Sequence, residues 1–511
     1  MPDLNNQVPF VNLSNYIIEL DAIKLIPENI ARKYTMIPLF LIRNTLTIAI
    51  LDPSNVPAID EARLCSGNEI QTLRADDAEI NMAIEQNYNL AGSMQGTIKD
   101  IERMAEDFLA GREVDVNRIQ KIVEEPPVIK LVNLIIFQAL KEKASDIHIE
   151  PEETRVKVRF RIDGVLHNML SFSSRIHMAI VSRVKVIARM NIVESRLPQD
   201  GHLTMLSGER KVDIRVSTFP ITFGEKVEMR ILDRSSGVAE LNKLGLSDAL
   251  LSKFEGMIRK PYGIILITGP TGSGKTSTLY AALSKLNSQE KNIITLEDPR
   301  EYILQGINQA EVNSAIGFTF ANGLRTILRQ DPDIIMVGEI RDAETAQIAI
   351  RAALTGRLVL STLHTNDAPG AITRLIDMEI EPFLIASGII GIISQRLVRV
   401  ICLKCKESYI PEEEAYKKIG LNPENPVKLY RGKGCMHCRQ TGYKGRVGIF
   451  ELMLMNNEIR QVTIKNRPTA DIRETANKTG LISLQQDGFD KVLAGITTLD
   501  EVLRVTYIDD K

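Results

Sequence analysis

The spacing of apolar and polar residues changes along the chain. In the first region of the chain, this spacing is typical of a small α/β unit. A helical pattern occurs around Pro27–Tyr34, and Leu46–Ile50 reads as an apolar strand. The segment Asn89–Gln120 is rich in small and charged residues, which is typical of a linker with some helical propensity. We therefore expect an N-terminal domain over residues 1–90 and a linker over residues 91–124.

The second region carries the two-residue period of β-strands. Its clearest stretch alternates basic with apolar side chains: Arg155, Lys157, Arg159 and Arg161 against Val156, Val158 and Phe160. This alternation predicts a half-buried strand with a cationic outer face. Further strand signals occur at Asp146–Glu150, Lys211–Ser217 and Lys226–Leu232. Since an amphipathic helical pattern precedes them, we expect one α+β domain over residues 125–240.

Beyond Leu241, short apolar strands alternate with helical segments. The clearest strands are Ile264–Thr268, Ile293–Leu296, Ile334–Val337 and Leu358–Thr362. Such alternation predicts a mostly parallel sheet covered by helices, in a domain over residues 241–511. The uncharged run Pro382–Gln395 is too short to cross a bilayer, and we expect a buried helix there.

Composition indicates a globular protein with several cores. The chain has 511 residues, of which 44% are hydrophobic and 25% charged. A net charge of −2 gives no global electrostatic reason to expect nucleic acid or anionic membrane as the main partner. The first residues lack the basic start and apolar core of a secretory signal. We expect a cytoplasmic protein whose association with a membrane is peripheral, through a partner.

The stretch LITGPTGSGKTSTLY, residues 266–280, has the order strand, loop, helix. Its spacing G-x-x-x-x-G-K-T suits a phosphate cradle, because glycines let backbone N–H groups converge above a helix N-terminus. Lys275 is expected to reach the β- and γ-phosphates, and the Thr276 hydroxyl to bind Mg²⁺. The residues expected to hold the nucleotide are Gly269, Pro270, Thr271, Gly272, Ser273, Gly274, Lys275, Thr276 and Ser277.

Two acidic motifs follow strands of the expected sheet. Ile293–Leu296 leads to Glu297, and Ile334–Val337 leads to Gly338 and Glu339. Because ligands of open α/β sheets bind at the carboxyl ends of strands, we expect both carboxylates to face the phosphates. One carboxylate that orients water and one that supports the Mg²⁺ shell would permit hydrolysis. Either motif alone is equally well explained as a solvated strand end or a helix N-cap.

His364 follows a further apolar strand in the stretch GRLVLSTLHTNDAPG. A lone histidine is more often structural than catalytic. Its place after a strand and a polar Ser361–Thr362 pair nevertheless favours a residue that senses the γ-phosphate. We assign it a sensor or coupling role rather than proton transfer.

Four of the five cysteines form two C-x-x-C pairs, Cys402 with Cys405 and Cys435 with Cys438. Each pair offers two thiolates on one tight turn, and two such turns close a tetrahedral structural Zn²⁺ site. Four free thiols and a redox pair are the alternatives. The fifth cysteine, Cys65, is expected to be a small buried hydrophobe.

Several stretches taken together resemble the secretion ATPase superfamily, and more narrowly the assembly motors of type II secretion and type IV pili (the GspE and PilB group). They are ASDIHIEP, RIDG, RLPQDG, DIRVSTFP, GPTGSGKTSTLY, ITLEDPREY, LRQDPDIIMVGEIRD, STLHTN and the paired C-x-x-C. This resemblance implies ATP as the nucleotide, a PAS-like second domain, and a RecA-like motor domain with a zinc element over residues 402–446 and a C-terminal helical region.

The resemblance also implies roles for single residues. Glu297 falls in the aspartate box, Glu339 is the Walker B glutamate, and His364 lies in the histidine box. Arg215 and Arg230 match arginines that the family directs from the second domain to the phosphates. If a guanidinium contacts the γ-phosphate only when the domains close, closure depends on whether ATP or ADP is bound.

At the level of the assembly, the resemblance implies a homohexamer at the cytoplasmic side of the inner membrane, docked on platform proteins through its N-terminal domain. The Gly- and Leu-rich segment that precedes this domain in cyclic-di-GMP-binding relatives is missing, so we do not expect that regulation. A DNA translocase or helicase-like motor shares the phosphate loop, but no basic, aromatic-interleaved stretch supports nucleic-acid binding. A scaffold that does not hydrolyse nucleotide is disfavoured by the presence of Lys275, Thr276, Glu297 and Glu339.

Overall fold

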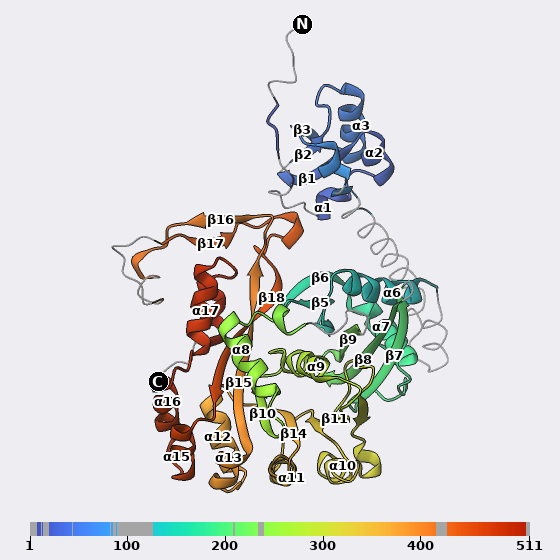
Figure 1. Ribbon diagram of the computed structural model, residues 1–511. Coiled ribbons are helices and arrows are strands. Elements are labelled where there is room, and N and C mark those ends of the chain that lie inside the picture. Colours follow the sequence, from blue (N-terminus) through green and yellow to red (C-terminus); the bar gives the residue numbers. More distant parts are fainter. Residues whose placement is uncertain are drawn as a thin grey trace. The chain divides into compact units, whose positions relative to one another are not determined.

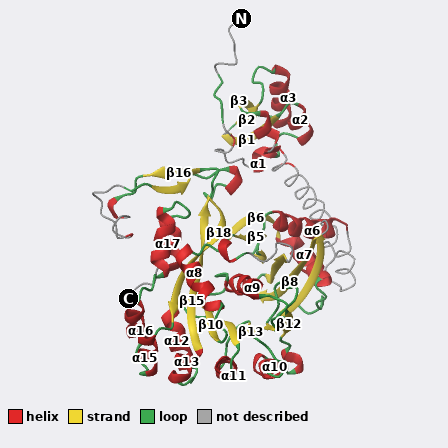
Figure 2. Cartoon of the chain, viewed as in Figure 1, coloured by secondary structure: helices red, strands yellow, loops and turns green. Residues whose placement is uncertain are grey.

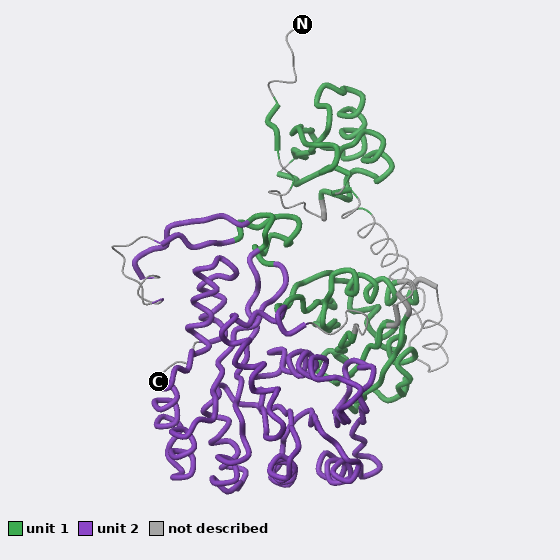
Figure 3. Tube along the Cα trace, viewed as in Figure 1, with its two compact units in different colours: residues 1–235, 402–405, 432–443 green, residues 236–401, 406–431, 444–511 purple. Residues whose placement is uncertain are grey.

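The computed structural model describes residues 8–506 apart from 12, 14–19, 43, 82, 85–87, 89–125, 208–209, 234–239, 415–418 and 420–426. The expected linker over residues 91–124 lies outside the described residues. The chain divides into two compact units (Figure 3). The first comprises residues 1–235, 402–405 and 432–443, and the second comprises residues 236–401, 406–431 and 444–511.

The N-terminal part of the first unit is a three-stranded sheet with helices (Figure 1). Its elements are α1 (Leu20–Ile23), α2 (Glu28–Lys33), β1 (Met36–Ile42), β2 (Thr45–Ile50), α3 (Val56–Ser66) and β3 (Glu69–Arg74). β2 is antiparallel to β1 and parallel to β3. The predicted helix and strand are confirmed as α2 and β2. The expectation for Cys65 is wrong, because α3 turns this residue to solvent while Ala58 and Ala62 form its buried side.

The other large part of the first unit is a six-stranded antiparallel sheet in the order β6-β5-β4-β9-β8-β7. Its strands are β4 (Asp146–Pro151), β5 (Arg155–Ile162), β6 (Val165–Ser173), β7 (Gln199–Ser207), β8 (Arg210–Ile221) and β9 (Gly224–Asp233). Its helices are α6 (Pro126–Lys141), α7 (His177–Ile187) and the short η3 (Ser174–Ile176). Val156, Val158 and Phe160 of β5 are buried in one core with both α-helices, as their two-residue period predicts.

The second unit is built on a seven-stranded sheet in the order β12-β11-β13-β14-β10-β15-β18. Its strands are β10 (Gly263–Thr268), β11 (Ile293–Glu297), β12 (Asn308–Glu311), β13 (Ile334–Val337), β14 (Leu358–Leu363), β15 (Ile389–Ile401) and β18 (Tyr443–Leu454). All pairs from β12 to β15 are parallel. The four predicted strands and their parallel arrangement are confirmed.

Helices cover both faces of this sheet (Figure 2). The helical segments of this part of the chain are η5 (Leu241–Lys243), α8 (Asp248–Ile258), α9 (Lys275–Leu286), the exposed η6 (Ser314–Ile316), α10 (Phe320–Ile327), α11 (Ala343–Leu354), α12 (Ala368–Asp377) and α13 (Pro382–Gly388). Alternate residues of β10 enter opposite cores, since Ile264 and Leu266 pack with α10 to α13 while Ile265 and Ile267 pack with α8 and α9.

The expected buried helix over Pro382–Gln395 is only half right. α13 ends at Gly388, and Ile389 begins the long strand β15. The β-branched residues Ile389, Ile390, Ile392 and Ile393 lie inside the sheet beside β10. Their branched side chains favour the pleated sheet, which overrides the uncharged character that suggested one helix.

The remaining elements follow β15. They are β16 (Lys406–Tyr409), β17 (Leu429–Gly432), η7 (Met436–Cys438), α15 (Asn457–Ile464), α16 (Thr469–Lys478), α17 (Leu484–Leu493) and α18 (Leu499–Thr506). β16 and β17 pair as a separate two-stranded sheet. Within the described ranges, none of the helices combines the length and apolar character needed to cross a membrane.

Candidate nucleotide-binding and metal sites

The phosphate-loop sequence forms the turn between β10 and α9. Gly269 has φ 150° and Gly274 has φ 88°, which residues with side chains rarely adopt. A Cβ at Gly269 would lie 2.5 Å from the carbonyl oxygen of Gln395, and one at Gly274 would lie 2.8 Å from Nε2 of Gln395. Glycine therefore lets the loop press against β15 while it turns into α9, whose first N–H groups point into the loop.

Lys275 and Ser273 supply polar side chains to this loop. Nζ of Lys275 donates to the carbonyl oxygens of Gly269 at 2.8 Å and Pro270 at 3.1 Å. Burial lowers the pKa of Lys275, and the nearby Glu339 carboxylate acts to raise it. Ser273 is 3% exposed, and no described residue offers its hydroxyl a hydrogen bond. A buried orphan hydroxyl beside a lysine and a helix N-terminus fits a phosphate group.

The other residues predicted to hold nucleotide lie on the outer side of the loop and the first turn of α9. Pro270, Thr271, Gly272 and Ser277 are exposed, and Gly274, Lys275 and Thr276 are partly buried. Thr276 is therefore not sealed in the core, as a ligand of a Mg²⁺ ion held by nucleotide phosphates must not be. Its role as a metal ligand stays a prediction.

Glu297 ends β11 but points into the protein. It is 3% exposed, and its carboxylate accepts hydrogen bonds from the Tyr280 hydroxyl, from Thr295 Oγ1 at 2.6 Å and from Gln309 Nε2 at 3.0 Å. Burial and the bond to Glu297 raise the pKa of Tyr280. Glu301 N donates to the same hydroxyl at 3.2 Å. Both oxygens of Glu297 therefore hold the segment after β11 in place.

Glu339 follows β13, the parallel neighbour of β11, and its surroundings differ. Its side chain is 17% exposed, its Oε2 lies 3.3 Å from Nε2 of His364, and its Oε1 accepts from Arg341. The hydrogen bond from Arg341 to Glu339 raises the pKa of that guanidinium. Arg341 also reaches Oδ2 of Asp298 at 3.5 Å. The structure thus brings Glu339 together with His364, within electrostatic range of Lys275.

Hydroxyl groups fix the loops that carry these residues. Thr362 Oγ1 donates to the Gly338 carbonyl at 2.8 Å, which ties the end of β14 to the Glu339 loop. Thr268 Oγ1 at the end of β10 accepts a hydrogen bond at 2.9 Å from the backbone N–H of Thr365, the residue that follows His364. These bonds explain why polar residues follow each apolar strand: they join the carboxyl ends of three adjacent strands into one surface.

Gln395 and Arg396 support the loop from β15, and the sequence analysis missed both. Oε1 of Gln395 accepts from Thr278 Oγ1 of α9 at 2.7 Å, and Gln395 is 2% exposed. Arg396 is 8% exposed, and its Nη2 donates to the carbonyl oxygen of Asn366 at 2.9 Å. The sequence does contain a signal for them, namely a Gln-Arg pair at the end of the run Pro382–Gln395. That pair indicates a role at the phosphate loop only once the end of the run is known to be a strand beside the loop.

Arg215 and Arg230 lie in the first unit, on adjacent strands. Arg215 of β8 is directly opposite Arg230 of β9, so both side chains are on the same face of the six-stranded sheet. Nε of Arg230 pairs with Oδ1 of Asp146 at 2.9 Å, and Nε of Arg161 lies 3.5 Å from Oδ2 of the same carboxylate. The predicted role of Arg215 and Arg230 at the phosphates stays a prediction.

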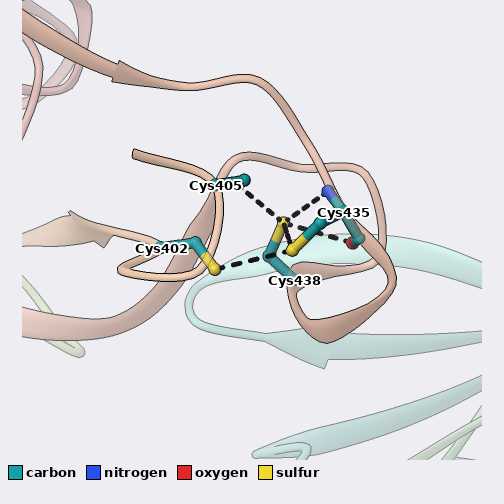
Figure 4. A group of neighbouring side chains, drawn as sticks. All are labelled: Cys402, Cys405, Cys435 and Cys438. Carbon is teal, nitrogen blue, oxygen red and sulfur yellow. Dashed lines mark hydrogen bonds between the residues drawn. The ribbon is translucent and has the colours of Figure 1, made fainter. Parts of the chain in front are cut away.

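The four paired cysteines converge in one cluster (Figure 4). Their Sγ atoms all lie within 4.8 Å of one another, and Cys402, Cys435 and Cys438 are buried. Burial opposes ionisation of Cys438, yet backbone N–H groups of Cys435, at 3.2 Å, and Gly442, at 3.3 Å, hold its pKa below the usual value. Four converging sulfurs with N–H donors to a thiolate fit a structural Zn²⁺ ion.

Comparisons with known proteins agree with this geometry. The family model "Type II/IV secretion system protein" matches residues 121–504, and that of the MshEN domain matches residues 6–94. The chain is 43% identical to the type IV pilus assembly ATPase PilB of Myxococcus xanthus over 98% of this chain and 89% of that protein. It is 46% identical to the type II secretion system protein E of Pseudomonas aeruginosa over 88% of this chain and 90% of that protein.

A solved structure of the pilus retraction motor PilT with bound ADP is similar with a TM-score of 0.50 and 27% identity, covering 73% of this chain and 96% of that one. The ATPase DotB of Legionella pneumophila shares the fold, with a TM-score of 0.54 and 20% identity over 73% of this chain and 94% of that one. These matches agree with the phosphate loop, the Glu339–His364 pair and the cysteine cluster. The chain therefore belongs to the type II/IV secretion system protein family, and it is an ATPase that uses ATP with Mg²⁺.

Proposed function

We propose that this ATPase is a hexameric motor that powers assembly of a type II secretion pseudopilus or extension of a type IV pilus. The observation that carries the proposal is the phosphate loop with Glu339, His364 and Lys275 grouped beside it, in a chain similar over most of its length to curated ATPases of both machines. The cysteine cluster supports the same assignment, since the resemblance places a zinc element in assembly motors.

The chain's own groups suit distinct tasks in this reaction. Lys275 and the N–H groups at the start of α9 hold the phosphates, and Thr276 offers its hydroxyl to Mg²⁺. Bound Mg²⁺ neutralises charge on the phosphate oxygens. Glu339 is partly exposed and orients the attacking water, while His364 contacts Glu339 and reports the state of the nucleotide.

Glu297 takes a different place in the proposal. Because its oxygens are held by Tyr280, Thr295 and Gln309, it positions the segment after β11 rather than contacting water or metal. Arg215 and Arg230 then supply the cations that reach the phosphates when the second domain closes on the motor domain.

We assign these tasks to an N-terminal docking domain over residues 1–90, a linker over 91–124, a PAS-like domain over 125–240 and a motor domain over 241–511. The docking domain binds a platform protein of the inner membrane, so the motor acts at the cytoplasmic side and is peripheral to the membrane. The match of residues 6–94 to the MshEN domain supports treating this region as a separate module.

The test uses the full-length chain with Mg²⁺ and ATP. We expect ATP hydrolysis and a six-subunit particle by native mass spectrometry, with hydrolysis abolished in Lys275→Ala. In cells, Lys275→Ala is expected to stop secretion or pilus extension while the protein still accumulates. A monomer that hydrolyses ATP at full rate, or hydrolysis that needs DNA and is lost with added salt, would contradict the motor proposal in favour of another P-loop enzyme.

A further inference from the structure

Arg396 of β15 lies directly behind the first glycine of the phosphate loop. A Cβ on Gly269 would come within 3.1 Å of its Nη1, so the guanidinium packs against the backbone there. Its Nη1 donates to the carbonyl oxygen of Gln395 at 3.2 Å, and its Nη2 donates to Asn366 O at 2.9 Å and Asn366 Oδ1 at 3.4 Å. Nζ of Lys275 also contacts this glycine, donating to its carbonyl oxygen at 2.8 Å.

This buried arginine forms no direct ion pair with a carboxylate of the described residues. Among the described residues, no carboxylate lies within ion-pair distance of Arg396, which is 8% exposed and bonded only to neutral oxygens. Burial lowers its pKa, and the more distant Asp367 and Glu451 raise it. A guanidinium nevertheless remains protonated, and an uncompensated buried charge is costly. Arg396 also acts to lower the pKa of Lys275, so the two cations are close enough to interact electrostatically.

The surroundings of Arg396 connect the phosphate loop to the C-terminal helices. Asp367 follows Asn366, caps α12 by accepting from Gly370 N at 2.7 Å, and also accepts from Arg473 of α16. Glu451 of β18 accepts from Ala368 N at 2.8 Å and lies 3.5 Å from Nη1 of Arg473. Both carboxylates are thus engaged by Arg473 and by backbone N–H groups, and they act on Arg396 only at longer range than an ion pair. The charge of Arg396 also acts on Lys275 in the loop.

We propose that Arg396 is a positioning residue for ATP, which braces Gly269 and the Asn366 loop from behind and adds a second fixed positive charge to the cradle formed with Lys275. The phosphate chain of the nucleotide is the anion on which the charges of Arg396 and Lys275 both act. The guanidinium acts through the backbone and the electric field, because it packs against Gly269 and donates to the carbonyl oxygens of Gln395 and Asn366. The proposal depends only on ATP binding, so it stands whether or not the chain is a hexameric motor.

The experiment measures equilibrium binding of a non-hydrolysable fluorescent ATP analogue to the full-length chain at several salt concentrations. We expect Arg396→Met to weaken binding about tenfold at low salt and to make binding less sensitive to salt, because one charge is lost. Arg396→Lys keeps the charge but not the forked contact with Asn366, so it should retain the salt dependence and lose only a few-fold in affinity.

Arg399→Met is the matched control on the same strand. Arg399 makes a partly buried ion pair with Glu501 at 2.7 Å, so its loss should lower the melting temperature while leaving the affinity and salt dependence of nucleotide binding unchanged. Wild-type affinity and salt dependence in Arg396→Met would overturn the proposal. It would equally be overturned if Arg399→Met weakened binding as much, since Arg396 would then act only through stability. If Arg396→Met fails to fold, Arg396→Lys tests the proposal instead. A reduced salt dependence in that variant, which keeps the positive charge, would contradict the role proposed for the charge.

Discussion

Glu297 and Glu339 end adjacent parallel strands of one sheet, yet their side chains meet opposite environments. Glu297 is buried and accepts from Tyr280, Thr295 and Gln309, whereas Glu339 is partly exposed beside Arg341 and His364. Two partners of Glu297, Tyr280 and Thr295, are fully buried, and Gln309 is partly buried. Those of Glu339 are surface groups, since the side chains of Arg341 and His364 are 59% and 50% exposed.

The difference shows how two similar acidic motifs acquire different tasks. A carboxylate whose oxygens are already occupied by buried donors cannot take on a water without breaking those bonds, each worth roughly 1.5–3 kcal/mol for a charged acceptor. A carboxylate held by exposed side chains can exchange one of them for water when nucleotide binds. Position at a strand end therefore does not decide between structure and chemistry, but the set of partners does.

The largest effect is expected for Glu339→Gln. Loss of the carboxylate should lower ATP turnover by roughly 10²–10³-fold, in the range of general acid–base contributions, while the analogue used to measure ATP binding still binds. Phosphate release and equilibrium binding measure the two quantities. Glu311→Gln is the control, because Glu311 is exposed and lies in register with Glu297 on β12. Equal turnover in wild type and Glu339→Gln would remove this residue from the chemistry.

Glu297→Gln is expected to act on stability before turnover. The amide keeps the shape but replaces one acceptor oxygen with a donor, which should destabilise the second unit by roughly 1–3 kcal/mol and lower its melting temperature by several degrees. Turnover well below that temperature should fall by less than tenfold. A variant with unchanged melting temperature and turnover as low as that of Glu339→Gln would reverse the distinction between the two glutamates.

Much of the motor-domain fold was predictable because local patterns and the final structure agree. The strands over residues 263–268, 293–297, 334–337 and 358–363 are short apolar runs followed by polar loops, and the phosphate loop and cysteine pairs have their own spacing. The run at residues 382–395 misled, because periodicity cannot separate a short buried strand from a buried helix. The missing signal was tertiary, namely the place of β15 beside β10.

The candidate site was predictable in its members but not in their orientation. Glu297 and Glu339 have similar local sequences, and only the long-range partners Tyr280 and Gln309 turn the first inward. Arg396 was missed for the same reason, since its relation to Gly269 spans more than a hundred residues and leaves no local pattern. Spacing shows which atoms a loop or turn brings together, whereas contacts between distant strands depend on packing.

Tyr280→Phe tests the structural role of Glu297, with a smaller expected effect than Glu297→Gln. It removes one donor to the buried carboxylate and should destabilise the second unit by about 1 kcal/mol. If the two residues act through their shared bond, the substitution should cost less in the Glu297→Gln background than in the wild type, as a double-mutant cycle of thermal unfolding would show. Strictly additive effects would mean that the bond from Tyr280 does not hold Glu297.

The smallest effect is expected for His364→Asn, on the exposed side of the comparison. The contact between His364 Nε2 and Glu339 is 3.3 Å long and half-exposed, and such pairs are typically worth no more than about 1 kcal/mol. Turnover should therefore fall by only about threefold, with little change in melting temperature, because the side chain of His364 is 50% exposed. The informative measurement is turnover in the double variant with Glu339→Gln. A histidine that acts through Glu339 should add nothing to the loss already caused there, whereas a further drop of the same size would give His364 a contact with the nucleotide of its own.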